Sequence, residues 1–159
     1  MTVLRELLNN HLLFWSLFSC ISAQILKVIF NYFVEKKIRF TIIFETGGMP
    51  SSHSALITAI TAGLGWDLGF DKPIFALAVG ISLIVMYDAS GVRRAAGFQA
   101  IEINKISKTL DIKTENELKE TLGHSKVEVI VGSILGPLIT LPGIEYLGSP
   151  LKIIDMILN

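Results

Sequence analysis

Three short polar clusters contain side chains of this sequence that could do chemistry. They are residues 47–54 (Gly-Gly-Met-Pro-Ser-Ser-His-Ser), 87–94 (Tyr-Asp-Ala-Ser-Gly-Val-Arg-Arg) and 123–128 (Gly-His-Ser-Lys-Val-Glu). A histidine can transfer protons near neutral pH, and an arginine can bind phosphate oxygens in a fork. Together these residue types indicate chemistry on a phosphate group.

The cluster 47–54 combines a turn with the start of a helix. Gly48 would let the backbone approach a ligand, while Ser51 or Ser52 could cap the helix. His53 would then lie in the first turn, where unpaired N–H groups and the positive end of the helix dipole favour a phosphate. A capped helix with an incidental histidine is the alternative, and Pro-Ser-Ser supports it well. The Gly-Gly pair and the histidine favour function.

The cluster 87–94 carries two arginines and one carboxylate. Arg93 and Arg94 could hold phosphate oxygens, although paired arginines after an apolar helix are also common topology anchors. Asp88 at the edge of an apolar segment is costly without a partner, and an arginine is the obvious one. We therefore expect one arginine to be structural and the other to be functional.

His124 and Glu128 are four residues apart, which places both side chains on one face of a helix. A carboxylate that holds an imidazole in one tautomer prepares it as a base or nucleophile. Ser125 and Glu128 also have the spacing of a capping box, which would use the same carboxylate on the backbone. Spacing alone does not separate these two interpretations.

Lys27 lies deep in an apolar run, three residues after Gln24. A lysine inside such a run is a functional candidate, with snorkelling to the nearby membrane edge as the alternative. The run begins after Arg5 and continues to about residue 34, so it is long enough to span a membrane. We interpret it as a retained first helix rather than a cleaved signal peptide.

The elements that must position the clusters are four apolar segments, at about 12–34, 50–66, 73–87 and 127–147. Hydrophobic residues make up 51% of the 159 residues and charged residues only 18%, which is little for the polar shell of a soluble domain. The second and third segments are short for a full span, so they are tilted spans or a re-entrant pair that turns at 66–72. The alternative is a buried helix pair of a soluble protein. Small residues in the second and fourth segments favour close contact in lipid.

We therefore predict an all-α, polytopic membrane bundle that forms a single domain over residues 1–159. It has about four transmembrane or re-entrant helices and a helical cytoplasmic connection. Ten of the fourteen Lys and Arg residues follow the first and third segments, and the positive-inside rule places those connections in the cytoplasm. All three polar clusters would then share the cytoplasmic face.

The connection over 91–123 contains two helical patterns. Apolar residues repeat at helical spacing at Ile103, Ile106 and Leu110, which predicts a helix along the membrane surface. Residues 114–117 (Thr-Glu-Asn-Glu) have capping-box spacing, which predicts a second helix that ends at Gly123.

Composition also excludes several classes of protein. The net charge is zero and no basic tract is present, so nucleic acid is not expected as a partner. Cys20 is the single cysteine, which excludes an intramolecular disulfide and a cysteine-rich metal site.

The three motifs, in this order, resemble the divergent PAP2 family, which is also described as related to acid phosphatase and vanadium-dependent haloperoxidase. Residues 23–27 (Ala-Gln-Ile-Leu-Lys) fit as well, and the resemblance covers nearly the whole chain. The better-known phosphatidic acid phosphatase type 2 enzymes have Pro-Ser-Gly-His where this chain has Pro-Ser-Ser-His, and His-x3-Asp where it has His124 and Glu128. Their first motif, Lys-x6-Arg-Pro, is absent, and so is the arginine that precedes the histidine in their third motif.

The resemblance implies a membrane phosphatase that hydrolyses a phosphomonoester. His124 would attack the phosphorus, Glu128 would orient it, and His53 would protonate the leaving alkoxide. The phosphoryl oxygens would be held by two groups of residues. The first is the cations Lys27 and either Arg93 or Arg94. The second is the residues at the predicted helix start, namely Gly48, Ser51 and Ser52. The resemblance implies no cofactor and no metal ion. A site at the membrane face implies an amphiphilic substrate, such as a phosphatidate-like or polyprenyl phosphate.

Two alternatives remain. The first is a non-catalytic membrane protein that binds lipid phosphate or acts as a scaffold, which the missing first motif favours. The second is an alcohol phosphotransferase that uses CDP-activated lipids, because Asp88, Gly91 and Arg93 faintly match its motif. The further aspartates that such an enzyme needs for metal ions do not follow.

A bundle this small has little room to bury a site alone, which favours self-association.

Overall fold

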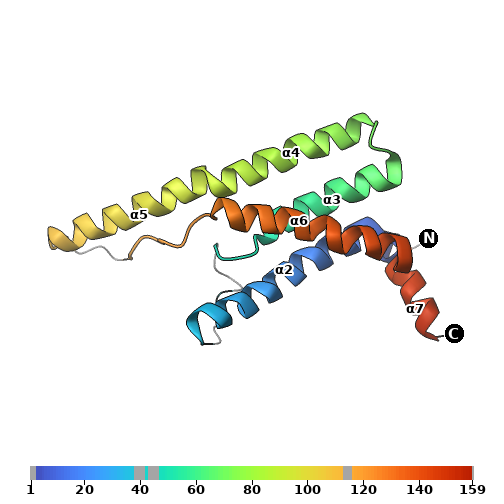
Figure 1. The fold of residues 1–159 in the computed structure, drawn as a ribbon, viewed down its shortest axis with the longest axis horizontal. Coiled ribbons are helices and arrows are strands. Elements are labelled where there is room, and N and C mark those ends of the chain that lie inside the picture. Colours follow the sequence, from blue (N-terminus) through green and yellow to red (C-terminus); the bar gives the residue numbers. More distant parts are fainter. Residues whose placement is uncertain (1–2, 38–41, 43–46, 113–115, 159) are drawn as a thin grey trace.

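The computed structural model describes residues 3–37, 42, 47–112 and 116–158, and within these ranges the chain forms helices and connections without a β-strand (Figure 1). The helices in chain order are α1 (Val3–Asn9), α2 (His11–Glu35), α3 (Ser52–Leu68), α4 (Pro73–Ser90), α5 (Val92–Thr109), α6 (Lys126–Pro142), the π-helical turn η2 (Gly143–Leu147) and α7 (Pro150–Leu158). The predicted all-α fold is confirmed.

Helix α3 lies at the centre of the bundle and packs against α2, α4 and α6. Its contact with α6 is close because α6 presents Gly132 and Gly136 to it. A Cβ at Gly132 would overlap the carbonyl oxygen of Ser51, and one at Gly136 would overlap that of Ala55. Small residues let two helix backbones approach in this way, so the close contact expected from the sequence is confirmed.

Three helices of the described chain are long and apolar enough to cross a membrane. They are His11–Glu35, the continuous α4–α5 rod over Pro73–Thr109, and α6 with η2 over Lys126–Leu147. The outer face of α4 exposes large apolar residues, including Ile84, which is 70% exposed. A soluble protein would bury such a face, whereas a lipid bilayer covers it. The alternative of a buried helix pair in a soluble protein is therefore not supported.

Helix α5 continues the line of α4 with only a turn at Gly91 between them (Figure 1). The helical hydrogen bonds of the backbone continue through this turn, because the Gly91 N–H donates to the Tyr87 carbonyl and the Ala95 N–H donates to the Gly91 carbonyl. The rod of 37 residues is about 55 Å long, whereas the hydrocarbon core of a bilayer is about 30 Å thick. The helix predicted near Ile103 is confirmed and continues the line of α4, whereas its predicted position along the membrane surface stays a prediction.

The second predicted helix of the connection, before Gly123, is wrong. The described residues 116–125 form no helix and run back along α5. The side-chain amide of Asn104 donates to the Leu118 carbonyl and accepts from the Leu118 N–H, each at 2.9 Å. These tertiary bonds use backbone groups that a helix would have paired internally. Thr114, the first residue of the predicted capping box, lies outside the described residues.

The opposite end of the bundle is fastened by side chains of α2. Trp15 donates its indole N–H to the Gly148 carbonyl at 2.8 Å, and a Cβ at Gly143 would overlap the Trp15 ring. His11 and Asp67 form a pair of 2.7 Å between Nε2 and Oδ2, which joins the start of α2 to the end of α3. Helix α3 therefore runs alongside α2 and ends near the start of α2.

Candidate active site at one end of the bundle

The starts of α3 and α6 and the end of α4 meet at one end of the bundle. The Ser51 N–H donates to the Glu128 carbonyl at 3.1 Å, and the His124 N–H donates to the Ala89 carbonyl at 2.9 Å. Gly123 has a φ of +82° and lies directly on the backbone at Arg94, where a Cβ would overlap the Arg94 nitrogen. The three polar clusters, which are far apart in the sequence, are thus brought together.

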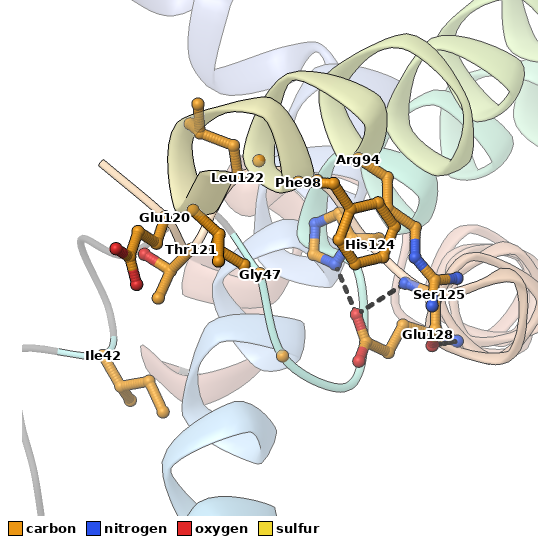
Figure 2. Close-up of a pocket in the computed structure, with 14 residues that line it drawn as sticks. Ile42, Gly47, Arg94, Phe98, Glu120, Thr121, Leu122, His124, Ser125 and Glu128 are labelled. Carbon is orange, nitrogen blue, oxygen red and sulfur yellow. Dashed lines mark hydrogen bonds and ion pairs between the residues drawn. The ribbon is translucent and has the colours of Figure 1, made fainter. Parts of the chain in front are cut away.

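His124 and Glu128 form the central pair of this site (Figure 2). Nδ1 of His124 lies 3.0 Å from Oε2 of Glu128, and the same oxygen accepts the Ser125 N–H at 3.1 Å. The hydroxyl of Ser125 in turn accepts the Glu128 N–H at 3.3 Å. One carboxylate therefore completes the capping box and orients the imidazole, so the two interpretations left open by the sequence occur together.

The orientation of His124 has a chemical consequence. The side chain is buried, with 6% of its surface exposed. A carboxylate acceptor favours the tautomer that carries its proton on Nδ1, which leaves a lone pair on Nε2. Among the described residues, Nε2 has no hydrogen-bond partner. The arrangement can supply a nucleophile or base whose positive form Glu128 would stabilise.

The two arginines have different surroundings. Arg93 donates from Nε to Oδ2 of Asp88 at 2.6 Å. It also lines a small cavity of about 30 Å³ together with His53 and His124. Arg94 lies over the Phe98 ring, 5.5 Å from its centroid, and faces a different cleft.

The expected division between a structural and a functional arginine stays a prediction. The arginine that pairs with Asp88 is the one beside both histidines. The pair uses only Nε of Arg93, so the two terminal amino groups have no protein partner among the described residues. Asp88 can thus orient Arg93 without occupying the nitrogens that would hold a phosphate.

Lys27 does not snorkel to the membrane edge. Its side chain is 2% exposed, and the backbone at Gly48 lies against its aliphatic stem, where a Cβ would lie 3.4 Å from Cγ. Gly48 in turn lines the same cleft as His124. The lysine singled out inside the first apolar run therefore belongs to the same end of the bundle as the polar clusters.

The start of α3 is partly used by the protein itself. The hydroxyl of Ser51 accepts the Ser54 N–H at 3.4 Å and the Ser54 hydroxyl at 3.0 Å, so it is the N-cap of the helix. Ser51 and Ser52 are buried, whereas His53 is exposed and lines the small cavity. Within the described chain, the N–H groups of Ser52 and His53 have no carbonyl partner.

A larger cleft of about 320 Å³ is also lined by His124 (Figure 2). Its lining includes Arg94, Phe98, Glu120, Thr121 and Glu128. Phe98, Glu120 and Thr121 were not predicted from the sequence as lining residues. The helical spacing of Phe98 from Arg94, and the position of the other two just before His124, were the available signals. His124 and Gly123 line both cavities and so form the wall between them.

Among the described residues, no three His, Cys, Asp or Glu side chains gather as ligands for a metal ion. The expectation that the reaction uses no metal and no cofactor stays a prediction.

Comparison with known proteins identifies relatives of this chain. The model of the divergent PAP2 family matches residues 8–139, which include every candidate site residue named above. The "Uncharacterized membrane protein YuiD" of Bacillus subtilis (strain 168) is 40% identical over 150 residues, covering 86% of this chain and 95% of that protein. No solved structure matches the chain significantly. The chain is an integral membrane protein that belongs to the divergent PAP2 family.

Proposed function

We propose that the protein is a membrane phosphatase that hydrolyses a phosphomonoester of an amphiphilic lipid or polyprenyl substrate through a phosphohistidine intermediate. The observation that carries the proposal is the placement of His124. Its Nδ1 is held by Glu128, and the ring lines the same small cavity as His53 and Arg93. A nucleophile, a proton donor and a cation are therefore adjacent.

In the first step, the Nε2 lone pair of His124 attacks phosphorus. The bond between phosphorus and the substrate oxygen breaks, and the protonated His53 gives its proton to the leaving alkoxide. The positive charge that develops on the His124 ring is stabilised by Glu128, 3.0 Å from Nδ1. Arg93 and Lys27 supply positive charge to the phosphoryl oxygens, where negative charge spreads in the transition state.

In the second step, water attacks the phosphohistidine. His53, now neutral, takes a proton from the water, and the bond between phosphorus and Nε2 breaks. Inorganic phosphate leaves, and His124 regains its lone pair with Nδ1–H still held by Glu128. The proton balance closes, because His53 begins and ends the cycle protonated. Burial, followed by the charge of Arg93, lowers the pKa of His53, so we expect the first step to be faster as the pH falls.

We place the site at the cytoplasmic face of the membrane. Lys36 and Lys37 follow the end of α2, and α5 extends from the same end of the bundle with further cations. The positive-inside rule puts such an end in the cytoplasm. Arg39 and Lys113, which also contribute to this charge count, lie outside the described residues. Labelling of an introduced cysteine in α5 with a membrane-impermeant thiol reagent, on whole cells and on inverted vesicles, would test the orientation.

The test of the function is phosphate release by the purified protein in detergent. A panel of lipid and polyprenyl phosphates is offered with chelator present, to the native chain and to His124→Ala. We expect release that is independent of metal ions and that His124→Ala loses while remaining folded by thermal unfolding. Normal turnover by His124→Ala would refute the nucleophile.

A binding or scaffold function is the second candidate, and one observation favours it. The Lys-x6-Arg-Pro motif of the phosphatidic acid phosphatase type 2 enzymes is absent from this chain. A binder would retain lipid phosphate in the same preparation without releasing phosphate. Binding would weaken in Arg93→Ala and would be insensitive to His124→Ala.

A further inference from the structure

An apolar groove lies between α4 and α6, with α3 as its floor. Both helices pack against α3 and make few contacts with each other, which leaves a cavity of about 380 Å³. The apolar walls are formed by Phe70, Phe75, Val79, Leu83, Met86 and Pro137. The groove belongs to the part of the bundle that the bilayer surrounds.

The hydroxyl groups in this groove are bonded to the protein. Thr61 and Ser82 share a bond of 2.7 Å between their oxygens, and Thr61 also donates to the Ile57 carbonyl at 2.8 Å. Thr58 donates to Ser54 and Ser133 donates to Ile130, each at 2.8 Å. Since these donors are already satisfied within the helices, the groove presents an apolar surface and suits an apolar occupant.

The groove and the histidine cavity lie along the same face of the α4–α5 rod. Val79, Ser82, Met86, Ala89 and Arg93 follow one another at intervals of three and four residues, which places them on one face of a helical rod. The first three line the groove, and the last two line the cavity with His53 and His124. A molecule with a charged head and an apolar tail could therefore occupy both.

The length of the groove fits one hydrocarbon chain. From Met86 to Phe75 the groove follows α4 for about 17 Å at 1.5 Å per residue, close to half of the roughly 30 Å hydrocarbon core. Phe70 and Phe75 lie at its far end with ring centroids 5.1 Å apart. The dimensions are those of a chain that descends through one leaflet.

We propose that this groove binds the hydrocarbon chain of the phosphomonoester whose phosphoryl group lies between His53, Arg93 and His124. The placement of the phosphoryl group rests on the proposed function. The groove then selects substrates with one long, slender chain directly attached to the phosphate. Each further methylene that enters the groove lowers the dissociation constant by up to about fourfold.

The test uses an alkyl monophosphate with a photoreactive diazirine at the end of its chain, in detergent. We expect the label on the peptide that contains Phe70 and Phe75. Unlabelled alkyl phosphate should compete with it, and the alcohol of the same length should compete at least tenfold less well. Filling the groove with Val79→Trp should reduce labelling at least fivefold. The matched control is Ile84→Trp, which adds the same ring on the outer face of α4 and should leave labelling unchanged.

If Val79→Trp does not fold, Leu83→Trp serves instead, because Leu83 lines the groove but is 59% exposed. Label that spreads over the outer faces of the bundle would contradict the proposal that the groove binds the hydrocarbon chain. Label that Val79→Trp and Leu83→Trp leave unchanged would contradict it as well. Label in the groove without phosphate release would support the binding of the hydrocarbon chain there and would contradict the proposed hydrolysis. Phosphate release with label elsewhere would support the proposed hydrolysis and would contradict the binding of the chain in the groove.

Discussion

The two ends of the bundle each carry a histidine–carboxylate pair, and the pairs differ in their surroundings. His11 and Asp67 are 2.7 Å apart with side chains 37% and 26% exposed, whereas His124 and Glu128 are 3.0 Å apart with side chains 6% and 22% exposed. The shorter bond thus belongs to the pair that has no proposed chemistry. A short distance between a histidine and a carboxylate does not by itself indicate catalysis.

The neighbours of each pair distinguish them. The His11 pair joins α2 to α3 across 56 residues, so its partners come from distant parts of the chain and fasten two helices. The His124 pair is local to the start of α6, but Arg93 and His53 line the same cavity as His124 and come from two other helices. A local pair supplies the proton chemistry, and long-range packing supplies the charges that a phosphate requires.

The largest expected difference between the two ends is in turnover. His124→Ala should reduce kcat for phosphate release by about 10⁴-fold or more, as loss of a nucleophile does. His11→Ala should leave kcat within about threefold, since it removes only a helix contact. Quenching with alkaline SDS during turnover of a ³²P-labelled substrate, which preserves the acid-labile P–N bond, should show labelled protein with native and His11→Ala chains and none with His124→Ala. Equal loss in both variants would erase the distinction between the ends.

The second comparison separates the two arginines. Arg93→Ala should lower kcat/KM by about 10²–10³-fold, the range for removing one donor from a developing oxyanion. Arg94→Ala should lower it by less than about tenfold, because Arg94 lies in the larger cleft over Phe98. Steady-state kinetics on one lipid phosphate would measure both. The reverse order of effects would move the phosphate to the larger cleft.

The third comparison removes one charge at each end. Glu128→Gln keeps an acceptor for the Ser125 N–H but loses the negative charge beside His124, so kcat should fall by about 10–100-fold. Asp67→Asn should change the free energy of unfolding by less than about 1 kcal/mol and leave kcat unchanged. Thermal unfolding and phosphate release on the same samples would separate the two effects. A Glu128→Gln chain with native kcat would indicate that this carboxylate acts only as a helix cap.

The smallest expected difference concerns stability. Gly132→Ala and Gly143→Ala should each reduce the free energy of unfolding by about 1–3 kcal/mol, because the added Cβ overlaps Ser51 in one case and the Trp15 ring in the other. Only Gly132→Ala displaces the contact between Ser51 and Glu128, so only it should also lower phosphate release. A Gly143→Ala chain that loses activity at temperatures where it is folded would contradict the independence of the two ends.

Much of the site followed from local sequence, because its signals span one or two helical turns. The four-residue spacing of His124 and Glu128, the cap at Ser51 and the apolar runs each depend on neighbours along the chain. The same locality explains the errors. The spacing of residues 114–117 predicts a helix, but the Asn104 side chain binds the backbone at Leu118 from the other side of the connection.

The sequence by itself determined the membrane class, the helices and the residues with chemical capability, because hydropathy, spacing and residue type are properties of the chain. The tertiary structure decided that Arg93 rather than Arg94 lies beside the histidines and that Lys27 points inward. It also decided that an apolar groove lies on the same face of the α4–α5 rod as the small cavity. These outcomes depend on how α2, α4 and α6 pack around α3, and that packing is fixed by contacts between residues far apart in the sequence.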